Sequence, residues 1–239
     1  MKRFRCVLWG ACGILLLAGC ETLDQGAAAL GALGGGQGLS GDTIIAGLRE
    51  ALSVGTRNTV SQTSRAGGYS QNPAIRIPMP EKLQGVASTL RKVGLGAQVD
   101  EFENRMNAAA ESAAAEAAPV FVDAIRGMTF EDARGILKGG NTAATEFFQR
   151  KTSDDLRRRY APIVTAQMQQ LGVVRQYDDL IGRYNSIPLV SKKTLKIEDY
   201  VTDQALKGLF LVLGEEEKKI RQDPAARTTE LLRQVFGNR

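Results

Sequence analysis

From Ser40 onward, apolar residues recur at helical spacing almost everywhere, and the alternation typical of β-strands is almost absent. One apolar stripe runs from Leu83 to Val93, a second from Val99 to Ala117, and a strongly apolar one from Leu206 to Leu213. This pattern predicts an all-α fold. We expect one domain over residues 40–239, built from roughly nine or ten helices, which is an ordinary length for a single domain.

Capping and breaking residues predict where several helices begin and end. Thr129 is placed to be an N-cap, with Asp132 at the capping-box position three residues later. Asn141 is a second candidate N-cap. Pro119 is expected to end the helix that precedes it, and Pro162 to break or kink the helix that contains it.

The segment from Gly67 to Pro80 interrupts the helical pattern with three prolines, which predicts a proline-rich extended loop. Ile75 and Ile77 flank Arg76, so the two isoleucines are expected to face inward and Arg76 outward. A second irregular stretch covers residues 187–196. Whether the two stretches pair as one very short β ribbon is left open by the sequence.

The N-terminus has the three parts of a secretory signal: a basic start at Met1–Arg5, an apolar run at Cys6–Leu16, and small residues before a cysteine. The apolar run is shorter than the ~20 residues of a membrane-spanning helix. Leu17–Cys20 resembles the bacterial lipobox, which implies cleavage after residue 19 and a lipid on Cys20. We therefore expect residues 1–19 to be a cleaved signal peptide.

Residues 20–39 are rich in glycine and alanine, which predicts a flexible tether between the lipidated cysteine and the helical domain. Glu21 follows the cysteine where the lipoprotein sorting rule would look for aspartate. That resemblance favours the outer membrane, with the domain facing the periplasm. The expected partners are thus the membrane, reached through the lipid anchor, and an unidentified envelope protein or amphiphilic ligand.

Removal of the signal peptide takes away Lys2, Arg3 and Arg5, so the net charge falls from +5 to +2 and nucleic-acid binding is not expected. The whole chain has no histidine, and Cys20 is the one cysteine that would remain. Histidine-dependent catalysis, histidine-ligated zinc and disulfides are therefore excluded from the mature domain. The sequence indicates no cofactor, no metal site and no catalytic residue.

Five segments resemble one known family, the uncharacterised bacterial "domain of unknown function 4197", many of whose members carry a lipobox. The resemblance covers essentially the whole chain after the tether. It implies a fold and a location, but no activity, substrate or site residue. The segments are DTIIAGLREAL (42–52), GYSQNPAIRIPMP (68–80), LRKVGLGAQVDEFE (90–103), YVTDQALKGLF (200–210) and IRQDPAARTTELLRQVFG (220–237).

Three classes of function remain after these exclusions. The first is a non-catalytic lipoprotein that presents a helical interaction domain to another envelope component. The second is a helical binding module for an apolar or amphiphilic ligand near the membrane. The third, least favoured, is a carboxylate-dependent hydrolase, because the acidic clusters fit helix first turns and solvated faces. These clusters are Asp100-Glu101-Glu103, Glu131-Asp132, Asp154-Asp155, Asp178-Asp179 and Glu215-Glu216-Glu217.

The segment Tyr69–Pro80 is the candidate contact surface, because its prolines stiffen it and it carries Tyr69, Asn72 and Arg76. Arg221 and Arg227 are expected to add guanidinium groups if the fold brings them near. The alternative is a structural strap, with Ile75 and Ile77 buried and Arg76 paired with a carboxylate. The sequence does not indicate an oligomeric state.

Overall fold

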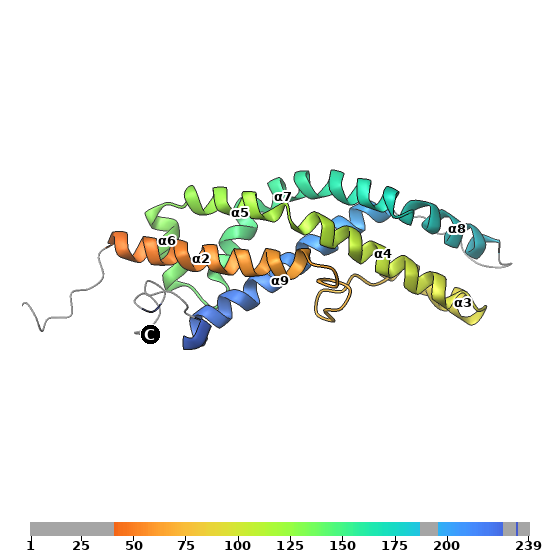
Figure 1. The fold of residues 1–239 in the computed structure, drawn as a ribbon, viewed down its shortest axis with the longest axis horizontal. Helices are drawn as coiled ribbons and strands as arrows, with labels where there is room; N and C mark the ends of the chain where they lie inside the picture. The colour runs from red at the N-terminus through yellow and green to blue at the C-terminus, as the bar shows by residue number, and fades with distance from the viewer. Residues whose placement is uncertain (1–40, 187–195, 227–232, 234–239) are drawn as a thin grey trace, which may run out of the picture. The chain divides into compact units, whose positions relative to one another are not determined.

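The computed structural model describes residues 41–186, 196–226 and 233, all within the larger of two compact units, residues 39–239. In these ranges the chain is helical and contains no strand, which confirms the predicted all-α class (Figure 1). The α-helices are α2 (Gly41–Ser64), α3 (Gln84–Lys92), α4 (Gly96–Ala114), α5 (Ala117–Arg126), α6 (Phe130–Lys138), α7 (Ala143–Gln170), α8 (Val173–Asn185) and α9 (Ile197–Gln222). Two 3₁₀ helices, η1 (Glu81–Leu83) and η2 (Pro224–Ala226), complete the described elements.

The predicted number of nine or ten helices is not confirmed in the described residues, and Pro162 does not break the helix that contains it. This proline lies inside a continuous 28-residue helix. A proline removes one helical hydrogen bond and leaves a carbonyl unpaired. Pro162 is exposed, so water can reach that carbonyl, while Val164 and Met168 continue the buried face beyond it.

The predicted capping box is confirmed at the start of α6. The Thr129 hydroxyl accepts from the Asp132 N–H at 3.1 Å, and the Asp132 carboxylate accepts from the Thr129 N–H at 3.1 Å. Pro119, in contrast, does not end a helix, because α4 ends at Ala114 and Pro119 lies in the first turn of α5. Proline is tolerated there since first-turn N–H groups have no partner within the helix.

Helix α4 lies at the centre of the core and packs against α2, α3, α7, α8 and α9. Figure 1 shows it in yellow-green beside the teal α7. Its alanine-rich half is fully buried from Ala109 to Ala114, apart from the exposed Ser112 and the slightly exposed Glu111. Small side chains there allow close approach, and the Tyr160 hydroxyl of α7 reaches the Ala114 carbonyl at 3.4 Å. No described helix is both long and apolar enough to cross a membrane.

Residues 65–80 form the loop between α2 and η1, here called the 65–80 loop. Its first part is not extended as expected: turn hydrogen bonds join Tyr69 to Asn72 and Asn72 to both Ile75 and Arg76. Ile75 and Ile77 are buried and the Arg76 side chain is 42% exposed, so the predicted alternation is confirmed. The expected ribbon partner, residues 187–195, lies outside the described residues.

We expect Gly208→Ala to destabilise the protein, although alanine normally favours a helix by about 1 kcal/mol over glycine. A Cβ atom at Gly208 of α9 would lie 2.7 Å from the Tyr69 ring and 3.1 Å from the Ile75 Cβ. Both neighbours are buried, so the clash should cost about 1–3 kcal/mol. Thermal unfolding followed by circular dichroism measures the change.

Gly182→Ala in α8 is the matched control, because a Cβ at that position meets nothing within 4 Å. This variant should be as stable as the wild type or slightly more stable. Equal stabilisation by both substitutions would contradict the close packing of the 65–80 loop on α9.

Candidate functional site

Three polar residues on one face of α4, spaced four apart, hold the backbone of the 65–80 loop: Glu103, Asn107 and Glu111. The central residue, Asn107, is fully buried. Its side-chain oxygen accepts from the Ile77 N–H at 2.8 Å, and its amide nitrogen donates to the Ile77 carbonyl at 2.9 Å. The side chain thus satisfies both backbone groups of Ile77, as a neighbouring β-strand would.

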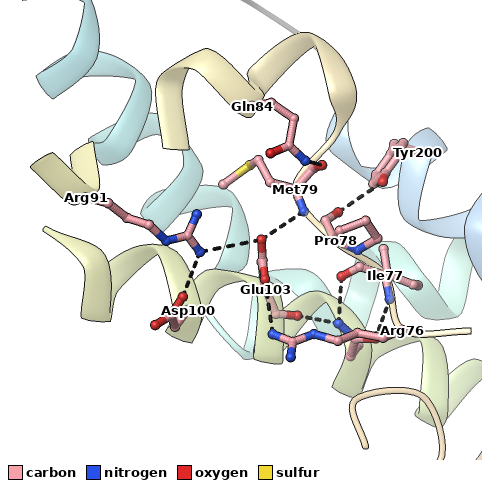
Figure 2. Close-up of polar contacts among 10 residues, drawn as sticks. Arg76, Ile77, Pro78, Met79, Gln84, Arg91, Asp100, Glu103 and Tyr200 are labelled. Atoms are coloured by element: carbon pink, nitrogen blue, oxygen red, sulfur yellow. Dashed lines mark hydrogen bonds and ion pairs between the residues drawn. The ribbon is translucent and has the colours of Figure 1, made fainter. Parts of the chain in front are cut away.

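Glu103 binds the end of the loop and two arginines (Figure 2). Its carboxylate accepts from the Met79 N–H at 3.0 Å and from the Arg76 guanidinium at 3.1 Å, and Arg91 lies 3.9 Å away. Arg91 also pairs with Asp100 at 2.7 Å. The arrangement neutralises a largely buried carboxylate, and it confirms that Arg76 pairs with a carboxylate of the fold.

Glu111 fixes the start of the loop. One carboxylate oxygen accepts from the N–H groups of Tyr69 and Ser70, both at 3.0 Å, and from the Ser70 hydroxyl at 3.1 Å. Three donors converge on a single oxygen, so this carboxylate is used by the fold. The 65–80 loop is therefore anchored to α4 at its start, middle and end.

Tyr69 is a core residue, which corrects its assignment as a surface contact. Its side chain is fully buried, and its hydroxyl donates to the Ala205 carbonyl of α9 at 2.6 Å. Burial, helped by the charge of Glu111, raises the pKa of Tyr69 far above its usual value. The neutral hydroxyl therefore persists as a donor. Tyr200 makes a similar link nearer the surface, where its hydroxyl donates to the Pro78 carbonyl at 3.0 Å (Figure 2).

Of the predicted contact residues in the loop, Arg76 is the most available at the surface. Asn72 is half-buried, and its side-chain oxygen accepts from the Ala74 N–H at 3.1 Å, which closes a local turn. Arg76 uses one terminal nitrogen for Glu103, and no described residue binds its other side-chain nitrogens.

Arg221 is not brought to the loop, because it lies sixteen residues after Ala205 on α9, about 24 Å along the helix at 1.5 Å per residue. Its side chain is 9% exposed, pairs with Glu217 at 2.8 Å and donates to the Ile136 carbonyl at 2.9 Å. Arg221 is thus part of the fold rather than a surface contact. Arg227 and Cys20 lie outside the described residues.

Glu217 of α9, a helix distant in the sequence but packed against α7, caps the N-terminus of α7. The sequence analysis gave this role to Asn141. Its carboxylate accepts from the N–H groups of Ala144 and Thr145 at 2.9 and 2.8 Å, and from the Thr145 hydroxyl at 2.9 Å. A negative charge at a helix N-terminus is favourable. Sequence reasoning missed this contact because Glu217 belongs to an acidic run that looks solvated.

Beside Glu217 lies a small apolar pocket between α2, α7 and α9, lined by residues such as Leu52, Phe148 and Leu213. Its volume is about 20 Å³, the space of about one water molecule. As described, it has no room for an acyl chain or another amphiphile.

A larger hollow lies between the 65–80 loop and α9, which we call the Arg76–Lys207 groove. It has a volume of about 130 Å³ and is lined chiefly by Ala74, Arg76, Gln204, Lys207 and Leu211. Lys207 also lines a second hollow of about 460 Å³ between α7 and α9. The Lys207 side chain therefore lies on the ridge between two hollows of the same surface.

The described carboxylates are mostly paired. Asp123 and Asp155 both line an open hollow of about 290 Å³, where they pair with Arg126 and Arg158. The buried carboxylates accept hydrogen bonds from the backbone or from cations, as shown above, and Glu216 binds Asn58 at 3.0 Å and Lys219 at 2.6 Å. Hydrogen bonds from Thr129 lower the pKa of Asp132, as expected for a capping carboxylate. Within the described ranges, no group of three or more acidic, cysteine or histidine side chains is placed to hold a metal ion.

One family model, described as "Protein of unknown function (DUF4197)", matches residues 38–237. Comparisons with curated proteins and with solved structures give no match. The match spans every described helix, and so includes the loop anchors on α4 and the Arg76–Lys207 groove.

Proposed function

The chain belongs to the DUF4197 family, and from this premise we propose that it is a non-catalytic lipoprotein of the bacterial cell envelope that binds another envelope component through its helical domain. The proposed anchor is a lipid on Cys20, and the proposed location is the outer membrane, facing the periplasm. The lipobox-like Leu17–Cys20, the preceding signal-like segment and Glu21 support this location.

The observation that carries the proposed binding function is the contrast between the interior and the Arg76–Lys207 groove. Inside, the carboxylates Glu103, Glu111 and Glu217 are all engaged by the fold. At the groove, Arg76 keeps unused donors, and Lys207 has no partner among the described residues. Hydrogen-bond donors held at the surface by an anchored loop and a helix favour binding of a partner. Carboxylates that already bind groups of the fold are not placed to catalyse hydrolysis of a substrate.

The other two classes receive less support. An amphiphilic ligand would need an apolar cavity, and the apolar pocket beside Glu217 has the volume of about one water molecule. A hydrolase would need two carboxylates facing each other across a cleft. The buried carboxylates instead face backbone N–H groups and cations. Asp123 and Asp155, which line one open hollow, each pair with an arginine.

Lipidation is tested by Cys20→Ser in the full chain. We expect this variant to leave the membrane fraction and to incorporate no labelled fatty acid, because the serine hydroxyl cannot form the thioether. Cell fractionation and metabolic labelling measure both effects. Membrane partition equal to that of the wild type would refute the anchor.

The binding function is tested by Arg76→Ala. Partly exposed ion pairs contribute about 1 kcal/mol or less, so the melting temperature should fall by no more than about 4 °C. We expect the variant nevertheless to fail to replace the wild type in a deletion strain.

Arg91→Ala is the matched control, since Arg91 also lies beside Glu103 and is 41% exposed, but does not line the groove. It should retain function. Equal loss of function in both variants would assign the effect to the ion pairs around Glu103 and contradict a contact role for Arg76.

A further inference from the structure

The Arg76–Lys207 groove is a preformed hollow with the dimensions of one amino-acid side chain. Its volume of about 130 Å³ corresponds to about four water molecules at ~30 Å³ each. One wall is residues 74–76 of the 65–80 loop, and the other is the face of α9 that carries Gln204, Lys207 and Leu211. The α9 wall is a regular helix, and the loop wall is anchored by hydrogen bonds.

The loop wall is held in place before any partner arrives. Ile75 is buried against Gly208, where the absent side chain allows the loop to touch the helix. The Ala74 N–H is fixed by Asn72, and the Ile77 backbone is fixed by Asn107. A rigid wall reduces the conformational entropy lost on binding.

The charge of the groove favours an anionic group. Lys207 and Arg76 are its charged lining residues, and Glu103, which pairs with Arg76, offsets one of these two positive charges. The neighbouring hollow between α7 and α9 is lined by two carboxylates, Asp154 and Asp203, and Asp203 pairs with Arg157 at 2.5 Å. An acidic group is therefore attracted to the Arg76 side of Lys207.

Two observations favour a peptide over a membrane surface as the occupant. Binding to anionic lipid usually takes a cluster of about four to eight basic residues, whereas two basic residues line this groove. Leu211, an apolar residue on the otherwise polar exposed stripe of α9, is 45% exposed at the groove. A carboxylate next to an apolar side chain matches this pairing of charge and apolar surface.

We propose that the Arg76–Lys207 groove binds an acidic peptide segment of the envelope partner. A carboxylate of the segment lies against Arg76 and Lys207, and a neighbouring apolar side chain packs on Leu211. This inference rests on the proposed function and specifies where the partner binds and which chemistry it presents.

The first test uses photo-crosslinking in living cells with the full lipidated chain. A photoreactive residue at Gln204, in the groove, is compared with one at Glu215, on the same helix outside it. We expect an adduct from position 204 whose partner peptide, mapped by mass spectrometry, contains an aspartate or glutamate. Lys207→Glu should abolish this adduct, and Lys218→Glu, an exposed change farther along α9, should preserve it.

The outcomes separate the inference from the proposed function. Adducts from other surfaces but none from position 204 would overturn the groove assignment and leave the proposed binding function intact. A lipid adduct, or a partner segment without an acidic residue, would overturn the peptide chemistry. No adduct from any surface position would overturn both.

The second test uses a defined probe with the purified full chain in detergent micelles. N-acetyl-glutamyl-leucine amide should shift NMR signals of the groove residues, and its glutaminyl analogue should bind about tenfold more weakly because it lacks the charge. Lys207→Glu, checked for an unchanged melting temperature, should weaken binding of the glutamyl probe by about the same tenfold factor. Equal binding of both probes, or equal shifts with inorganic phosphate, would overturn the proposal.

Discussion

Replacing Glu217 with alanine is expected to lower the free energy of unfolding by about 3 kcal/mol or more. The substitution leaves the N–H groups of Ala144 and Thr145 at the start of α7 without their acceptor. It also leaves the largely buried Arg221 without its carboxylate. Chemical denaturation followed by circular dichroism measures the loss.

Glu215→Ala is the control, because Glu215 is exposed in the same acidic run and makes no hydrogen bond within the described residues. It should change stability by less than about 0.5 kcal/mol. The stability of Glu217→Gln should lie between those of the two alanine variants. The amide keeps one oxygen that can accept from α7, but its NH2 group is a donor that faces the N–H donors of α7. If Glu217→Ala and Glu215→Ala were equally stable, Glu217 would not cap α7.

Asn107→Ala is expected to cost about 3 kcal/mol, because it leaves the buried Ile77 N–H and carbonyl unpaired and removes the bond to the Glu103 carbonyl. The middle anchor of the 65–80 loop is lost with it. We therefore expect a lower melting temperature together with faster hydrogen exchange at Ile77. Native-state hydrogen exchange measures the local effect separately from global unfolding.

Asn104→Ala tests the same residue type on the exposed face of the same helix. It should be nearly neutral, because alanine favours the helix and no described partner is lost. Faster exchange in the loop of the Asn104→Ala variant would show that the loop depends on α4 in general. The three-point anchoring by Glu103, Asn107 and Glu111 would then be wrong.

Local sequence patterns were sufficient to predict the structural features that depend on residues close together in the sequence. Helical periodicity predicted the all-α class, because each helix must bury one stripe of apolar residues. The Thr129–Asp132 capping box was predictable because both partners lie within one turn. The burial of Ile75 and Ile77 around Arg76 followed from alternation over three residues.

Proline positions were ambiguous at the sequence level. Pro119 and Pro162 both looked like helix breaks, yet the first lies in a first turn and the second on an exposed face of α7. A proline in the first turn removes no helical hydrogen bond, and a proline inside a helix is tolerated where water or another group can satisfy the carbonyl that it leaves unpaired. Where the helix begins decides the first case and burial decides the second, and both are properties of the folded chain.

The sequence by itself determined the helical class, the local caps and the candidate loop. Only the tertiary structure decided which polar residues hold the fold together and which remain at the surface. Tyr69 and Arg221 looked like contacts, but their side chains donate to the carbonyls of Ala205 and Ile136. Lys207 was not singled out, but the fold places it beside Arg76 at one groove. A residue's type and local spacing do not reveal a partner 85 or 136 positions away, because that pairing is fixed by how the helices pack.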